Sequence, residues 1–86
     1  MPKVAIVMGS DSDLPVVKGA IETLKQFGIE VEARVISAHR TPQRAAKFAE
    51  GAARARIEVI VAAAGKSAHL AGVLASHTAL PVIGLP

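Results

Sequence analysis

Unbroken apolar runs that alternate with segments of helical periodicity constrain the fold of this chain more than any other feature of its sequence. The runs at residues 3–8 and 57–64 carry one charged residue each, and they show no polar–apolar alternation. Such runs are typical of strands buried on both faces. In the intervening segments, 14–27 and 41–52, apolar residues recur at the spacing of one helical face. Alternating strands and helices predict a parallel α/β sheet with right-handed crossovers.

Residues 29–36 have a different pattern, because apolar and charged side chains alternate there. This alternation predicts a strand with one solvated face, at an edge of the sheet. A short helix over about residues 67–76 and a fourth strand at 81–84 complete the pattern. With the first and third strands inside, we expect the flavodoxin-like strand order 2-1-3-4, with helices on both faces.

We expect a single α/β domain over residues 1–86, because no linker or low-complexity segment interrupts the chain. The fourth strand would form an unpaired apolar edge, which proteins normally cover. The pattern therefore predicts that this chain is a truncated part of a longer protein, or that another subunit covers the edge.

Three residues mark helix boundaries. Gly28 is placed to end the first helix, since glycine adopts the left-handed conformation at low cost. Thr41 and Pro42 are expected as the N-cap and the first residue of the second helix. The buried face of that helix is expected to consist of Ala45, Phe48, Ala49 and Ala52.

Composition excludes several classes of function. The chain has no cysteine, which excludes disulfides, thiolate metal sites and cysteine nucleophiles, and its three histidines lack the carboxylate cluster that would predict a metal. The net charge of +3 comes with two Phe and no Trp or Tyr, which favours a small anionic substrate over nucleic acid. No signal peptide or membrane-spanning run is visible, so a cytoplasmic location without membrane contact is expected.

Polar residues gather directly after the predicted strands. They lie in MGSDSD at residues 8–13, in ISAHRTP at 36–42 and in AAAGKSAHLAG at 62–72. The carboxyl ends of parallel strands meet at one edge of a sheet, where ligands bind at the switch in strand order. The coincidence of the three segments predicts a binding site at this edge.

The first segment offers groups for two parts of a ligand. The hydroxyls of Ser10 and Ser12 and a helix N-terminus suit a phosphate, whereas Asp11 and Asp13 would accept hydrogen bonds from sugar hydroxyls. Aspartate is also a preferred N-cap, so Asp13 could simply cap the first helix.

His39 is the candidate acid–base residue, because an imidazole both gives and takes a proton near neutral pH. Arg40 beside it suits an anion; an ordinary loop histidine is the alternative. His69 could serve the site or only the start of its helix, and His77 is expected at a solvated helix end. The sequence GKS at residues 65–67 lacks the first glycine of GxxxxGK[ST], which argues against a P-loop.

Three segments together resemble the N5-carboxyaminoimidazole ribonucleotide mutase family, the catalytic subunit family of phosphoribosylaminoimidazole carboxylase in purine biosynthesis. They are MGSDSDLP, VISAHRTP and AAAGKSAHLAGVLAS followed by LPVIGLP. The resemblance covers all 86 residues, and the first two motifs are highly specific in this order and spacing. It implies a flavodoxin-like α/β/α subunit, a homo-octamer, and neither a metal nor an organic cofactor.

The resemblance also implies an enzyme that moves a carboxyl group from N5 of a ribonucleotide to C4 of its imidazole ring. Release and recapture of CO2 would carry the group, and His39 would shuttle the proton. Two alternatives stay open: a carboxylase that uses aminoimidazole ribonucleotide and CO2 directly, and an inactive nucleotide-binding fragment. The residues that match the family's substrate-binding positions are Ser10, Ser12, Asp13, Ser37, Ala38, Arg40, Gly65, Ala68, His69 and Leu70.

The chain departs from the family pattern at several positions. Lys66 replaces a glycine of the third loop, where a cation would either attract an anionic group or block the site. Ala63 and Ala71 replace a usual glycine and a usual proline in the same region. Arg56 stands where the second helix of the family commonly ends in glycine, and a left-handed conformation there would cost about 1–2 kcal/mol. Members of the family also continue well beyond the last strand of this chain.

Overall fold

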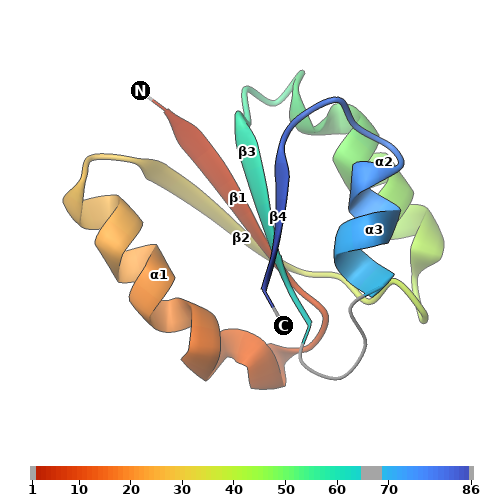
Figure 1. Cartoon of the computed structure of the whole chain (residues 1–86), viewed down its shortest axis with the longest axis horizontal. Helices are drawn as coiled ribbons and strands as arrows, with labels where there is room; N and C mark the ends of the chain where they lie inside the picture. The colour runs from red at the N-terminus through yellow and green to blue at the C-terminus, as the bar shows by residue number, and fades with distance from the viewer. Residues whose placement is uncertain (1, 65–68, 86) are drawn as a thin grey trace.

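The computed structural model describes residues 2–64 and 69–85. Its centre is a sheet of four parallel strands in the order β2-β1-β3-β4 (Figure 1). This order confirms the predicted flavodoxin-like arrangement, with β1 and β3 inside and β2 at an edge. The strands are β1 (Lys3–Met8), β2 (Glu30–Val35), β3 (Val59–Ala63) and β4 (Val82–Leu85).

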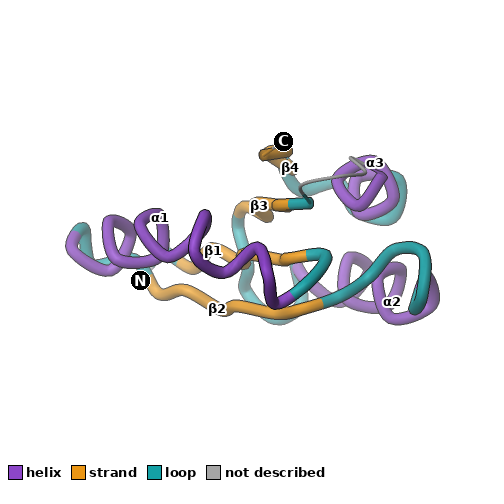
Figure 2. The backbone as a smooth tube through the Cα atoms, turned by 90° about the horizontal axis from the view of Figure 1, so that it is seen from below, coloured by secondary structure: helices purple, strands orange, loops and turns teal. Residues whose placement is uncertain are grey.

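Helices cover both faces of the sheet, as predicted. In Figure 1, α1 (Leu14–Gln26) lies on one side of the strands, and α2 (Pro42–Ala52) and α3 (His69–Ala75) lie on the other. Figure 2 shows α2 and α3 next to each other. A short 3-10 helix, η1 (Asp11–Asp13), connects β1 to α1. Within the described ranges, no helix has the length and apolar character needed to cross a membrane.

The pairing register aligns the ends of the three strands that precede the polar segments. Met8, the last residue of β1, pairs with Val35 of β2 and with Ala63 of β3. The ladder continues one step further, because Gly9 N donates to Ala63 O at 3.0 Å and Ile36 N donates to Met8 O at 2.8 Å. The polar segments therefore leave the sheet at a common edge.

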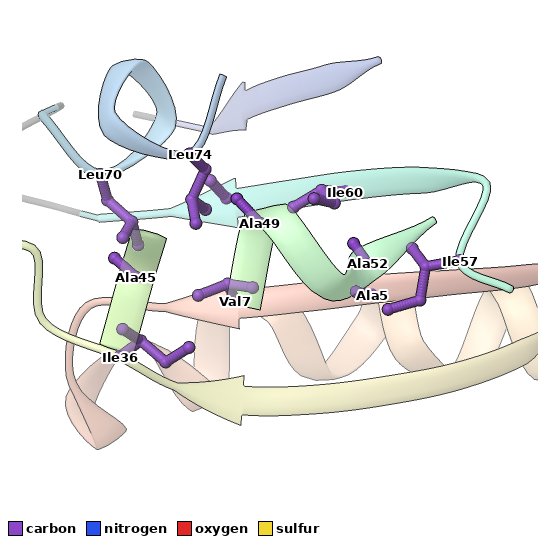
Figure 3. Packing of buried hydrophobic residues seen from close by; sticks show 11 residues of the cluster. Ala5, Val7, Ile36, Ala45, Ala49, Ala52, Ile57, Ile60, Leu70 and Leu74 are labelled. Atoms are coloured by element: carbon purple, nitrogen blue, oxygen red, sulfur yellow. The ribbon is translucent and has the colours of Figure 1, made fainter. Parts of the chain in front are cut away.

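Two apolar cores lie on the two faces of the sheet, and β1 contributes to both. Successive side chains of a strand point to opposite faces. Ala5 and Val7 accordingly belong to the larger core beneath α2 and α3 (Figure 3), and Ile6 and Met8 belong to the smaller core beneath α1. The predicted buried face of α2 is confirmed, with its three alanines buried and Phe48 half-buried against the larger core.

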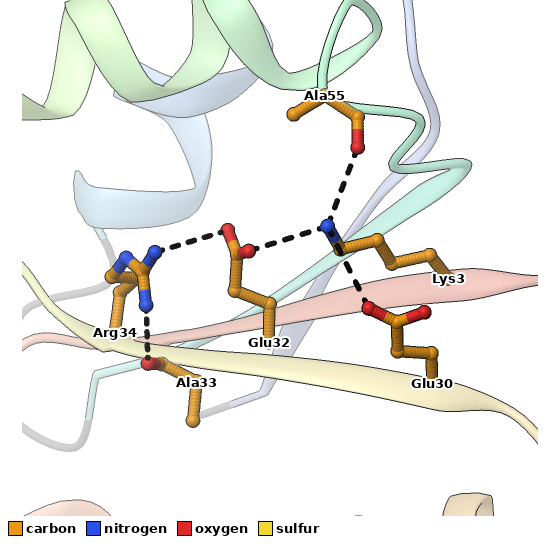
Figure 4. Close-up of polar contacts among 6 residues, drawn as sticks. All are labelled: Lys3, Glu30, Glu32, Ala33, Arg34 and Ala55. Atoms are coloured by element: carbon orange, nitrogen blue, oxygen red, sulfur yellow. Dashed lines mark hydrogen bonds and ion pairs between the residues drawn. The ribbon is translucent and has the colours of Figure 1, made fainter.

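A row of charges marks the β2 edge on the side of the sheet that faces the end of α2 (Figure 4). Lys3 Nζ lies 3.4 Å from Glu32 Oε1 and 3.8 Å from Glu30 Oε2, and it donates a hydrogen bond to Ala55 O. Arg34 Nη2 lies 3.5 Å from the other oxygen of Glu32. Charged side chains on an edge strand disfavour pairing with a further strand. The alternation in β2 thus protects this edge of the sheet.

The helices α1 and α2 end in the same backbone motif. The N–H groups of Gly28 and Ile29 donate back to carbonyl groups in the last turn of α1. Those of Arg56 and Ile57 donate back to the carbonyl groups of the residue after α2 and of the last residue of α2. This pattern of two returning bonds is the Schellman motif, which places one residue in the left-handed conformation. That residue is Gly28 at α1, with φ 75°, and Arg56 at α2, with φ 69°.

Candidate functional site

A groove of about 470 Å³ lies at the edge of the sheet where β1 and β2 end. The β1–η1 turn forms one wall, and the loop from β2 to α2 together with the first turn of α2 forms the other. Its lining residues are Gly9, Ser10, Asp11, Val35, Ser37, Arg40, Thr41 and Arg44. The groove therefore joins two of the three segments that the sequence placed at this edge.

The first wall is held together by a capping box. Ser12 N donates to Ser10 Oγ at 3.2 Å, and Ser10 N donates to Asp13 Oδ2 at 3.1 Å. Asp13 occupies the N-cap position of α1, but its side chain makes no capping hydrogen bond to that helix. The alternative in which Asp13 caps α1 is therefore wrong, since its carboxylate closes the turn of η1 instead.

The hydroxyl of Ser10 is already fully engaged within this wall. It accepts from Ser12 N and from Ser12 Oγ at 3.0 Å, and it lies 3.4 Å from Asp11 Oδ1 as a donor. A hydroxyl has one proton and two lone pairs. A ligand that bound to Ser10 would thus have to displace one of these contacts, whereas Ser12 Oγ keeps lone pairs for a ligand donor.

The second wall is organised by Ser37. Its carbonyl oxygen accepts from Thr41 N at 2.8 Å and from Thr41 Oγ1 at 2.9 Å, and its Oγ accepts from Arg40 N at 3.1 Å. Thr41 is the N-cap of α2, as predicted, but its side chain makes no hydrogen bond to the helix. The predicted N-cap position is therefore confirmed, and the Thr41 hydroxyl bonds the preceding loop instead of the helix. These bonds leave the proton of Ser37 Oγ without an acceptor among the described residues.

Two histidines from distant parts of the chain meet beside this wall. The ring centroids of His39, in the loop before α2, and His69, the first residue of α3, lie 5.3 Å apart with an interplanar angle of 40°. Both residues are exposed. Two imidazoles at this separation bring two proton-transfer groups next to a polar groove.

The other predicted substrate-binding residues divide into three groups. Ala38 is half-buried and packs against the larger core. Leu70 is 2% exposed as a whole residue and belongs to that core, so the described structure gives it no open surface for a ligand. Gly65 and Ala68 lie outside the described residues, as does Lys66.

Arg44 is a groove residue that the sequence reasoning missed. It lies on the first turn of α2, four positions beyond Arg40, and both residues line the groove. The available signal was the start of α2 at the ligand-binding edge, since the first turn of such a helix must lie near the site. In the described part of the chain, neither arginine takes part in an ion pair.

Residues 2–64 and 69–85 contain no group of three histidine, aspartate or glutamate side chains that could hold a metal ion. The groove instead presents hydroxyls, one carboxylate and two guanidinium groups. Fold and groove together define a flavodoxin-like α/β domain with a polar groove at the carboxyl ends of β1 and β2.

Comparison with known proteins assigns the domain more narrowly. A sequence profile of the family "AIRC: AIR carboxylase" matches residues 3–86, and the chain belongs to this family. It is 58% identical over 86 residues to N5-carboxyaminoimidazole ribonucleotide mutase of Thermotoga maritima and 57% identical to the protein of that name in Saccharolobus solfataricus. The alignments cover 100% of this chain and 50% and 54% of those proteins. The chain thus spans about half the length of these relatives.

Two further similarities bear on fold and chemistry. The crystal structure of Treponema denticola PurE matches with a TM-score of 0.88 and 33% sequence identity, over 98% of this chain and 54% of that one. Phosphoribosylaminoimidazole carboxylase of Saccharomyces cerevisiae is 52% identical over 85 residues, which are 99% of this chain and 15% of that protein.

Proposed function

We propose that this chain carries the substrate site of an N5-carboxyaminoimidazole ribonucleotide mutase in purine biosynthesis. The observation that carries the proposal is the contact between His39 and His69 beside a groove lined by hydroxyls and guanidinium groups. The identity of 58% to a mutase over every residue of this chain supports the same assignment. The reaction is an isomerisation within one ribonucleotide.

The proton balance of this reaction suits a single imidazole. Loss of CO2 breaks the bond between N5 and the carboxyl carbon, and N5 takes up a proton with the electron pair that remains. C4 then attacks the carbon of CO2, forms the new bond and releases its own proton. One proton therefore moves from C4 to N5 overall, and a group that gives and then takes a proton completes the cycle. We assign this role to His39, with His69 positioned against its ring.

The remaining groups suit the other parts of a ribonucleotide. The Asp13 carboxylate, supported by Ser10 N, would accept hydrogen bonds from ribose hydroxyls, together with Ser12 Oγ. The Ser37 hydroxyl and the Arg40 guanidinium would face the phosphate, because both line the groove as donors. By the family resemblance, Ala38, Gly65, Ala68 and Leu70 would supply the remaining substrate-binding positions. This assignment needs neither a metal nor an organic cofactor.

Assembly into a homo-oligomer, an octamer by resemblance, belongs to the same proposal. Several large apolar side chains are exposed on the outer surface: Leu14, Val16, Phe27, Val35 and Ile83. Val16 is 69% exposed and Phe27 is 76% exposed, and apolar surface of this kind favours contact with further protein. We place the assembly in the cytoplasm, away from membranes and nucleic acid.

A direct carboxylase is the second candidate, favoured by the 52% identity to phosphoribosylaminoimidazole carboxylase. It would add CO2 to C4 of aminoimidazole ribonucleotide and release the C4 proton to His39. An inactive nucleotide-binding fragment is the third candidate, favoured by the half-length match.

Ultraviolet monitoring of the interconversion of the two carboxylated ribonucleotides tests the proposal. We expect turnover by the chain, a loss of about 10²–10⁴-fold in His39→Asn, and no loss in His77→Asn, a histidine two residues beyond the end of α3. Conversion of aminoimidazole ribonucleotide and CO2 without activity on the N5-carboxylated substrate would identify the direct carboxylase instead. A folded chain that binds the ribonucleotide without turnover would identify the inactive fragment.

A further inference from the structure

The groove is lined by a second arginine, Arg44, in addition to Arg40 of the ISAHRTP segment. Arg40 and Arg44 both line it, whereas Asp11 is the only carboxylate among the lining residues that the structure describes. The Asp11 carboxylate also accepts a hydrogen bond from Ser10 Oγ, on the opposite wall from the arginines. These described residues therefore carry an excess of one positive charge.

The acidic side chains elsewhere in the described residues do not neutralise the two arginines. The carboxylates in ion pairs are those of Glu30, Glu32 and Glu50, and their partners are Lys3, Arg34 and His77. A guanidinium group that has no carboxylate partner keeps its donors for an anionic ligand, and its geometry suits phosphate. Each guanidinium group has a planar fork of donors that matches two phosphate oxygens.

The position of Arg44 is fixed by the start of α2. Its backbone N–H donates to Thr41 O at 3.1 Å in the first turn, and Thr41 in turn is bonded twice to Ser37 O. The backbone N–H of Arg40 also donates to Ser37, at its side-chain Oγ. One hydrogen-bonded loop thus holds the backbones of both arginines and of Ser37 at the same wall of the groove.

We propose that Arg44 is a second phosphate-binding residue of this site, and that with Arg40 it selects a dianionic phosphate monoester. The inference rests on the proposed function, since it concerns the phosphate of the same ribonucleotide. Arg40 alone balances one negative charge, and Arg44 balances the second. A ligand with a single negative charge at this position gains little from Arg44.

Calorimetric titration with ribose 5-phosphate and with ribose 5-sulfate at one pH tests this inference, because the sulfate ester has the same shape and one charge fewer. We expect the unmodified chain to bind the phosphate more tightly than the sulfate. Arg44→Gln should weaken binding of the phosphate about tenfold, as loss of one hydrogen-bonded charge does, and should change binding of the sulfate much less. Arg44→Lys should restore part of the preference, because the charge returns without the fork.

Lys47→Gln is the matched control, since Lys47 is an exposed cation of α2 that does not line the groove. Equal binding of both esters by the unmodified chain, or equal losses in Arg44→Gln and Lys47→Gln, would overturn the inference. The titration is independent of turnover. Selective loss of phosphate binding in Arg44→Gln therefore supports the inference even if the chain is inactive, and that inactivity would count against the proposed function alone.

Discussion

Replacement of Arg56 by glycine should stabilise this domain, because Arg56 is an L-residue in the left-handed conformation. Its φ is 69°, and Gly28 occupies the equivalent position of α1 with φ 75°. The left-handed region costs a residue with a Cβ about 1–2 kcal/mol relative to glycine. Glycine gives back about 0.4–1 kcal/mol through the greater entropy of its unfolded chain. The expected net gain for Arg56→Gly is therefore roughly 1 kcal/mol.

The surroundings of Arg56 add little to this estimate. Its side chain is exposed and takes part in no ion pair within the described residues, so its removal breaks no strong contact. At Gly28, an added Cβ would meet nothing within 4 Å. Gly28→Ala is thus the reverse experiment, with a purely conformational cost that we expect to be about 1 kcal/mol.

Urea unfolding and thermal unfolding, both followed by circular dichroism, measure the two effects. In the thermal experiment, a gain of about 1 kcal/mol moves the midpoint of a domain of this size by roughly 4–8 °C. Arg56→Ala separates side chain from backbone, since it removes the same long chain but retains the Cβ, and it should leave the free energy of unfolding nearly unchanged. The reasoning fails if Arg56→Gly is no more stable than Arg56→Ala.

Two further predictions concern the face covered by α2 and α3. Leu74 is fully buried in the larger core, so Leu74→Ala should lower the free energy of unfolding by about 2–5 kcal/mol. The loss would appear as a large fall in the urea midpoint, and a change below about 1 kcal/mol would show that this core is loosely packed. Glu50 Oε2 lies 3.2 Å from His77 Nδ1, and the two side chains are 60% and 38% exposed, so Glu50→Gln should change the free energy of unfolding by less than about 1 kcal/mol. A larger loss would mean that this pair holds the end of α3 against α2.

Most of the fold could be predicted from the sequence, since it depends on periodicity. A strand buried on both faces must be apolar at successive positions, and an edge strand must alternate, so the runs at 3–8, 57–64 and 29–36 predicted the order of the first three strands correctly. Gly28 ended α1 as expected, because the left-handed conformation is a property of one residue and its backbone. The possible strain at Arg56 was visible for the same reason.

The side-chain hydrogen bonds at the site followed a different logic. Thr41 and Asp13 both stand at helix starts, where propensity predicts that their oxygens cap the helix. In the structure the Thr41 hydroxyl bonds the preceding loop, and the Asp13 carboxylate reaches back to Ser10 N. A polar side chain has several partners within reach, and the path of the loop decides among them.

The sequence by itself determined which segments become strands and helices, and which polar segments follow them, because burial and backbone conformation leave a periodic record along the chain. Only the tertiary structure decided that His39 and His69 lie 5.3 Å apart and that Arg44 lines the same groove as Ser10. Both arrangements bring together residues from separate crossovers between strands. Their geometry depends on the pairing register of β1, β2 and β3 and on the packing of α2 against α3, which no local pattern encodes.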